Sequence, residues 1–237
     1  MSATVTLSTL RTRAKQRADM VNSDFVTEAE WNSYINSSIK WLYDLLVKAY
    51  GNDYYCSDST FVTVAGQQDY PFATMSTPIT DFYKLLGVSM MVNSSEELPL
   101  KRFNFLSRDK HSGSYSISRH GRTLVRYRLK GSGIYLSPQP DSGISIKVYY
   151  IPHATTLEND TDTFDGINGW EELVIIDSAM KALIKEESDV SAIMAERQTH
   201  LDRINEMAED RDSGAPDTIT DTSGYFDYDP WNGGREL

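Results

Sequence analysis

The side chains best suited to catalysis or metal binding are few in this chain and lie far apart. The four histidines are His111, His120, His153 and His200, and none has the spacing of a zinc site or of the H-E-x-x-H motif. Cys56 is the single cysteine, and the neighbouring sequence offers it no histidine base. A half-buried position on a strand is the simpler interpretation of Cys56. These residues predict neither a catalytic site nor a metal site.

An acidic cluster at residues 159–166 resembles a calcium loop only superficially. Such a loop needs acids at positions one, three and five, glycine at six and glutamate at twelve. Counted from Asp160, Glu171 falls at twelve, but the glycine is displaced by one position. Adjacent glutamates at 171–172 and 186–187 point to different sides of a helix, so they form no acid/base couple. With no glycine-rich phosphate loop present, we expect no enzyme and no cofactor.

Positive charge is concentrated in one stretch of an otherwise acidic chain. Residues 101–130 contain nine Lys/Arg against Asp109 alone, a net charge of +8, whereas the whole chain carries −11. Tyr127 alternates with arginines there, as in a single-stranded nucleic-acid groove, but the overall charge favours an acidic neighbouring protein. We therefore predict a basic inter-subunit or tail-facing surface. Its residues are Arg102, Arg119, Arg122, Arg126 and Arg128.

The last residues, 213–237, show no periodicity but combine acids with aromatic side chains. Segments that merely solvate are poor in aromatics, and this one has four within seven residues. We predict a segment that docks on a partner or on a neighbouring subunit. The alternative is that it packs back on its own domain. The four docking residues are Tyr225, Phe226, Tyr228 and Trp231.

Two helices are predicted before a β-rich block and two after it. Apolar residues recur at helical spacing over residues 7–21, and a second helix begins at the Thr27–Glu30 capping box and ends near Gly51. The third helix covers residues 173–187, and the fourth, with Ser188 or Asp189 as its cap, fades near residue 213. Each pair alone leaves an apolar stripe in water, so we expect one four-helix bundle.

Between the helices the hydrophobic period changes to two. Alternating runs occur at residues 60–64, 123–129 and 144–151, separated by glycine and proline turns, and residues 152–168 read as a polar loop. Helix-length patterns between the strands are missing, so the strands predict an antiparallel sandwich or barrel.

The predicted fold class is therefore α+β, with four segments. Residues 1–52 form the first half of the helical bundle, 53–165 the inserted β-rich domain, 166–212 the second half of the bundle, and 213–237 the extended docking tail.

The composition predicts a soluble protein of a reducing compartment. Hydrophobic residues make up 40% and charged residues 24% of the 237 residues, which is usual for a folded soluble chain. Neither an apolar run of membrane-spanning length nor a signal peptide is present, so we expect no membrane contact. A lone cysteine and no secretion signal predict a cytoplasmic site of synthesis.

Several segments, taken in order, resemble the head-to-tail adaptor (connector) proteins of tailed bacteriophages. The resemblance covers roughly residues 6–210 and leaves the acidic aromatic tail outside it. No single motif is specific, but their order and spacing together are. The segments are 6–20 (TLSTLR to RADM), 25–31 (FVTEAEW), 42–46 (LYDLL), 82–88 (FYKLLGV), 134–138 (IYLSP), 148–152 (VYYIP) and 164–171 (FDGINGWE).

That resemblance implies a structural virion protein made in the host cytoplasm and located at the neck between head and tail. Such adaptors form a ring that binds the portal protein on one side and tail or nozzle proteins on the other. The resemblance implies that this ring is a dodecamer. They extend the channel through which DNA passes without specific binding. We expect acids of the helical bundle, and not the arginines of 101–130, to face that channel, because negative charge repels DNA phosphates.

Two other interpretations stay open at this point. The chain could be a different neck or tail ring, such as a terminator or completion protein. It could also be a cell-wall hydrolase, although no acid/base pair supports that activity.

Overall fold

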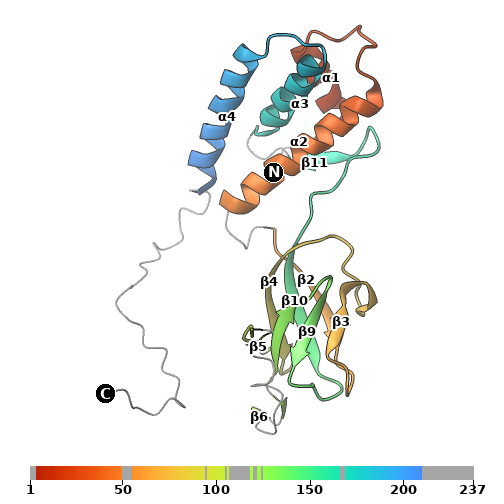
Figure 1. The fold of residues 1–237 in the computed structure, drawn as a ribbon, viewed down its shortest axis with the longest axis vertical. Helices are drawn as coiled ribbons and strands as arrows, with labels where there is room; N and C mark the ends of the chain where they lie inside the picture. Colours follow the sequence, from red (N-terminus) through yellow and green to blue (C-terminus); the bar gives the residue numbers. More distant parts are fainter. Residues whose placement is uncertain are drawn as a thin grey trace, which may run out of the picture.

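Helices gather at one end of the structure and most of the strands at the other (Figure 1). The structure is a computed structural model that describes residues 4–49, 55–93, 95–104, 106, 118–119, 122–123, 125–165 and 169–209. The helices are α1 (Leu7–Arg17), α2 (Glu28–Ala49), α3 (Glu171–Lys185) and α4 (Ser191–Glu209), with a short 3-10 turn, η1 (Phe72–Thr74). The strands are β1 (Thr4–Thr6), β2 (Ser57–Val62), β3 (Asp69–Pro71), β4 (Phe82–Met91), β5 (Glu97–Pro99), β6 (Ser118–Arg119), β7 (Arg122–Thr123), β8 (Arg126–Leu129), β9 (Gly133–Ser137), β10 (Ser145–Pro152) and β11 (Thr163–Asp165).

All four helices contribute side chains to one core. The predicted capping box of α2 is confirmed: the Thr27 amide donates to the Glu30 carboxylate at 2.9 Å, and the Glu30 amide donates to the Thr27 hydroxyl at 3.3 Å. One face of α2 then buries Trp31, Ile35 and neighbours one and two turns on, against the inner face of α3. Burying each such Leu or Ile is worth roughly 1.5–3 kcal/mol, which holds the helices together.

Helix α1 is shorter than its apolar spacing predicts. We expected it to continue to Val21, but it ends at Arg17, and Val21 is 54% exposed. Asp19 takes a left-handed conformation, and the Met20 amide donates to the Lys15 carbonyl at 2.8 Å. This is a Schellman end, which glycine usually signals in sequence; here an aspartate, which tolerates that conformation, takes glycine's place.

Two antiparallel sheets enclose the core of the β part. One sheet has the order β2-β10-β4-β5 and the other β3-β9-β8. Alternate residues of β10, beginning with Ile146 and Val148, are buried, so the period of two in the sequence is confirmed as an inward-facing row. Sheet pairing is antiparallel in each case, as the turn spacing predicts.

A single segment joins one edge of the two sheets. Strand β5 pairs with β4, and a few residues later the Tyr127 amide of β8 donates to the Lys101 carbonyl at 3.1 Å, while the Phe103 amide donates to the Tyr127 carbonyl at 3.1 Å. On the opposite side, β2 and β3 remain outer strands of separate sheets. Of the sandwich and the barrel that the sequence left open, the strands in the described ranges do not form a closed barrel.

The segment predicted as a polar loop, residues 152–168, contains a strand. β11 pairs with β1 next to the helices, and the Val5↔Phe164 pair lies at the centre of its register (Figure 1). Leu157 is buried against the helical core, and its backbone exchanges two hydrogen bonds with the side chain of Asn36 in α2, at 2.8 and 2.9 Å. A strand of three residues is too short to show a hydrophobic period in the sequence. It forms because it can pair with β1, which lies about 160 positions earlier in the chain.

The architecture is thus mixed α and β, with four helices and antiparallel sheets, as predicted. The proposed docking residues Tyr225, Phe226, Tyr228 and Trp231 lie outside the described residues.

Candidate interaction surfaces

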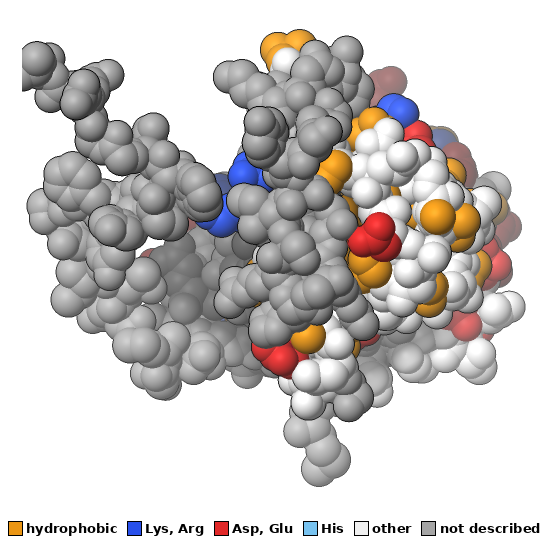
Figure 2. All heavy atoms as spheres, turned by 90° about the horizontal axis from the view of Figure 1, so that it is seen from below, with side chains coloured by type: hydrophobic (Ala, Val, Ile, Leu, Met, Phe, Trp, Pro, Cys, Tyr) orange, Lys and Arg blue, Asp and Glu red, His pale blue; other side chains and the backbone are white. Residues whose placement is uncertain are grey.

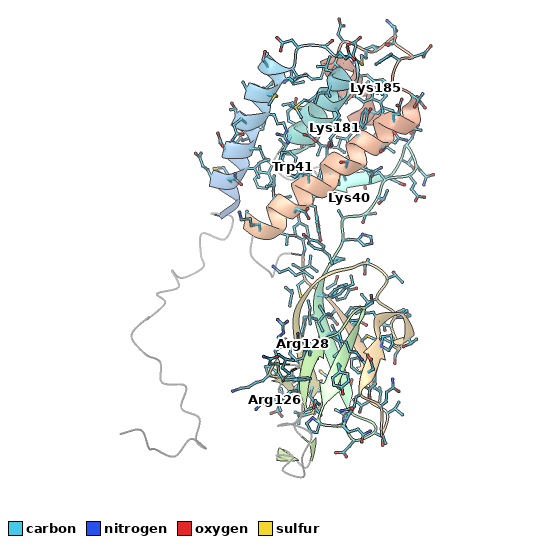
Figure 3. The ribbon with its side chains drawn as sticks, in the orientation of Figure 1. Lys40, Trp41, Arg126, Arg128, Lys181 and Lys185 are labelled. Atoms are coloured by element: carbon cyan, nitrogen blue, oxygen red, sulfur yellow. The ribbon has the colours of Figure 1, made fainter. Side chains whose placement is uncertain are left out.

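The predicted basic surface lies on the edge of the β part. Strand β8 is the outer strand of its sheet, with β9 between it and β3. Tyr127 points into the core and is 9% exposed, so Arg126 and Arg128 on either side of it point outward (Figure 3). Arg102 lies beside Tyr127 through a parallel bridge and is exposed. The fold therefore brings three of the five predicted arginines to one edge.

The other two arginines belong to a separate short hairpin. Arg119 in β6 pairs through its backbone with Arg122 in β7. Their side chains lie outside the described residues. Viewed from the β end, Lys and Arg side chains are visible at two separate places on the described surface, and Asp and Glu are spread over it (Figure 2).

A hollow of about 310 Å³ opens beside this basic edge. One side is the first half of β4, where Phe82, Leu85 and Leu86 contribute apolar side chains, and the other side is formed by Tyr127 and Leu129 of β8. Two cations, Lys84 and Arg102, also line it. An apolar floor with a few charged groups at the rim is typical of a site that accepts side chains of another molecule.

Cations elsewhere in the described ranges are mostly engaged within the molecule. Arg11 is buried and pairs with Glu28 and Asp160, so it ties α1 to the start of α2 and to the turn before β11. The remaining pairs include Arg13 with Glu172, Arg17 with Glu196, Lys130 with Asp69, Lys147 with Glu97, and Lys185 with Glu30. By contrast, neither Lys101 nor Arg102 has an acidic partner among the described residues. Lys101 and Arg102 are therefore available to an outside acid.

The helical part contains a buried charge cluster that the sequence did not reveal. Asp177 of α3 is 3% exposed and accepts from Ser38 of α2 at 2.7 Å, Arg197 of α4 at 2.8 Å and Lys181 of its own helix at 2.8 Å. Burial alone raises the pKa of Asp177, but hydrogen bonds from Lys181 and Ser38 and the charges of Lys181 and Arg197 outweigh it and hold the pKa below its usual value. The guanidinium of Arg197 also stacks over Trp41, at 4.2 Å from the ring centre (Figure 3). These contacts join three helices.

The only sequence signal for this cluster was an Asp–Lys pair four residues apart on α3, within an otherwise apolar helix. A buried acid with satisfied partners is structural: it fixes how the helices sit against one another.

A second hollow, of about 460 Å³, lies where the helical and β parts meet. The Tyr43 hydroxyl of α2 donates to the Pro152 carbonyl at 2.7 Å, and the Tyr83 hydroxyl of β4 donates to Asp44 at 2.9 Å. Burial raises the pKa of Tyr43 to about 12, with the charge of Asp81 adding to the effect. His153 also lines this hollow, and its backbone amide donates to the Asp81 carbonyl at 2.6 Å. Lys40 contributes one cation to the rim (Figure 3). Tyrosines and one histidine connect the two parts here. They are not arranged as a nucleophile beside its base.

Two further results bear on the class of protein. In the described part of the chain, no group of three or more His, Cys, Asp or Glu side chains is placed to hold a metal ion. No helix there combines the length and apolar character that crossing a bilayer requires.

Comparison with protein families decides the relationship. The sequence model of the SU10 adaptor protein family matches residues 5–220, which is most of the chain. This chain belongs to the SU10 adaptor protein family. The resemblance to phage head-to-tail adaptors, drawn from segments between residues 6 and 210, is confirmed. A search among curated proteins finds no match.

Membership in the SU10 adaptor family makes the chain a phage structural adaptor and a component of the virion. The family implies interaction with other capsid or tail proteins, and it implies a structural, non-enzymatic role. The match extends to residue 220 and stops short of Tyr225, so the four residues predicted to dock lie outside it.

Proposed function

We propose that this chain forms the ring that joins the portal of a tailed phage to its tail and extends the DNA channel between them. The observation that carries the proposal is the match to the SU10 adaptor family over residues 5–220. The ring is dodecameric in this proposal, with the portal protein on one side and tail or nozzle proteins on the other. It is made in the host cytoplasm and ends at the virion neck.

The charge distribution supports a ring built from unlike surfaces. Each subunit of a closed ring needs two different faces that fit each other. The basic edge of Arg102, Arg126 and Arg128 is one such face, and the rest of the chain is strongly acidic. We assign the basic edge to contacts with a neighbouring subunit or the tail, and the acids of the helical part to the channel, where they let DNA pass without specific binding.

We also propose a division of labour along the chain. Residues 1–52 and 166–212 form a four-helix bundle stabilised by Asp177, residues 53–165 form the inserted β-rich domain, and residues 213–237 form the docking tail. The tail residues Tyr225, Phe226, Tyr228 and Trp231 bind a partner or neighbouring subunit in the assembled neck.

The experiment is reconstitution with the portal of the same phage. The purified chain and the portal are mixed, and mass measurement and electron microscopy give the number and position of bound copies. We expect a ring of this chain on one face of the portal, with fewer copies retained when residues 225–231 are deleted. If the chain does not bind the portal, or lies at the far end of the tail in particles, the proposal is contradicted and a terminator or completion ring is favoured instead.

A further inference from the structure

We propose that the segment Tyr225–Trp231 of one copy docks in the hollow between β4 and β8 of the neighbouring copy. We call this hollow the β4–β8 slot; Phe82, Leu85, Leu86, Arg102, Tyr127 and Leu129 line it. The inference rests on the ring proposed above. It states that the basic edge of one copy binds the tail of another copy, so that both surfaces belong to a single contact.

The slot has the chemistry that an aromatic segment requires. Its walls are the side chains of Phe82, Leu85 and Leu86 on one side and Tyr127 and Leu129 on the other. Except for Tyr127, these apolar residues are only partly buried, so a ring inserted between them removes further apolar area from water. A volume of about 310 Å³ accepts side chains and excludes a folded domain.

The rim of the slot has the charge that an acidic segment requires. Arg102 lines the slot, Lys101 precedes it, and both are exposed with no acidic partner among the described residues. Most other described cations are paired internally, whereas Lys101 and Arg102 can bind an incoming carboxylate without giving up an ion pair within the molecule.

The tail has the complementary pattern at a spacing of two. In an extended segment, Phe226 and Tyr228 lie on one side, and Asp227 and Asp229 lie on the other together with Tyr225 and Trp231. Pro230 favours an extended conformation at the residue before it. The side with Phe226 and Tyr228 fits the walls of the slot, and the two aspartates on the other side stay at its rim, where Arg102 lies. The segment needs no helix or sheet of its own to present both.

The tether allows the contact between copies. Helix α4 ends at Glu209, at the end of the helical part that faces the β part (Figure 1). Residues 210–224 separate it from Tyr225, and fifteen residues span at most about 50 Å when fully extended. A slot on one subunit and a tail on the next are the unlike patches that a closed ring needs, so we assign the tail to the neighbour's slot.

The first experiment measures the contact independently of ring formation. A fluorescent peptide of residues 221–233 is titrated into the full-length chain whose own tail is disabled by Phe226→Ser, Tyr228→Ser and Trp231→Ser. We expect saturable binding that weakens about tenfold when Arg102→Glu is added. A peptide with Asp227→Lys and Asp229→Lys recovers most of that loss on the Arg102→Glu chain, because the charges are exchanged.

The matched control is Lys48→Glu, the same charge change at an exposed cation near the end of α2, which should leave peptide binding unchanged. Circular dichroism and thermal melting check that each variant is folded. If the peptide does not bind, or binds all the charge variants equally, the slot is not its site and the inference fails, even if the ring on the portal is found.

The second experiment separates a neighbour's tail from the chain's own. With exposed Cys56→Ser as background, one chain carries Tyr228→Cys and another carries Leu86→Cys, and the two are mixed on the portal and oxidised. We expect a disulfide-linked heterodimer. A parallel sample uses one chain that carries both Tyr228→Cys and Leu86→Cys. If a disulfide forms only within that chain and no heterodimer forms in the mixed sample, the tail binds its own slot and the neighbour assignment is overturned. Peptide binding without any ring on the portal would instead contradict the proposed function and leave the slot standing.

Discussion

Arg197 of α4 donates from Nε to the carboxylate of Asp177 of α3 at 2.8 Å, and the acid is almost completely buried. Ser38 of α2 donates to the other oxygen of the same carboxylate at 2.7 Å. A single side chain therefore connects three helices. The helical part of this adaptor depends on that charge far more than on any one of its exposed ion pairs.

The first prediction concerns this carboxylate. Asp177→Asn leaves the cations of Lys181 and Arg197 without their counter-charge, and because both are partly exposed we expect a loss of about 2–4 kcal/mol in the free energy of unfolding. Urea unfolding followed by helical circular dichroism measures it. The control is Glu206→Gln, an exposed acid on α4, which should change stability by no more than about 0.5 kcal/mol. An Asp177→Asn chain as stable as the wild type would show that the cluster is dispensable.

The second prediction concerns acid. Hydrogen bonding from Lys185, and then from Thr27, lowers the pKa of Glu30 from 4.5 to about 2. Since the folded pKa lies below the unfolded one, the stabilisation is complete above pH 4.5 and is lost as the pH falls toward 2. The urea midpoints of the wild type and Glu30→Gln should therefore differ at pH 6 and converge by about pH 2. A constant difference across that range would mean that the ion pair with Lys185 does not form in solution.

The third prediction concerns the junction of the helical and β parts. Tyr43→Phe removes the hydrogen bond to the Pro152 carbonyl and should cost about 1 kcal/mol at neutral pH. Because burial raises the pKa of Tyr43 from 10 to about 12, its contribution is full below pH 10 and declines as the pH rises toward 12, so the variant should lose less stability in that range.

Tyr83→Phe is the comparison for this junction, because the Tyr83 hydroxyl donates to the exposed Asp44 side chain and its loss should cost less. Unfolding midpoints of both variants across pH 7–11 make the comparison. Equal losses of stability in the two variants would show that the hydrogen bond of Tyr43 contributes no more than that of Tyr83.

The fourth prediction concerns two glycines of the β part. A Cβ on Gly133 would lie 2.7 Å from the Tyr70 carbonyl oxygen and 2.9 Å from Pro71 Cα, both backbone atoms of the paired strand β3. Gly133→Ala should therefore destabilise the chain by about 1–3 kcal/mol. Gly87→Ala meets nothing within 4 Å and should be neutral or slightly stabilising. Thermal melting of the two variants tests the contrast, and equal melting temperatures would refute it.

Local patterns were enough to predict the four helices and the main strands of the β part. The hydrogen bonds of the Thr27–Glu30 cap join residues three positions apart, and burial in β10 alternates every two residues. Both patterns are therefore visible in the sequence, and both are found in the structure. The end of α1 was placed too late because Asp19, and not a glycine, adopts the left-handed conformation that stops it. The arginines of 101–130 could be recognised as a surface from their charge, but only the fold shows which of them share an edge.

By itself, the sequence determined that two helices precede a β-rich block and two follow it, and it determined the excess of acid, the basic stretch and the adaptor family. Each of these follows from residues near one another or from their order along the chain. The tertiary structure decided that Ser38 and Arg197 meet at Asp177, that β11 joins β1, and that Arg102 and Leu86 line one slot. These partners are up to 160 residues apart, and only the packing of two hydrophobic cores brings them together, since contact across such distances leaves no periodic trace in sequence.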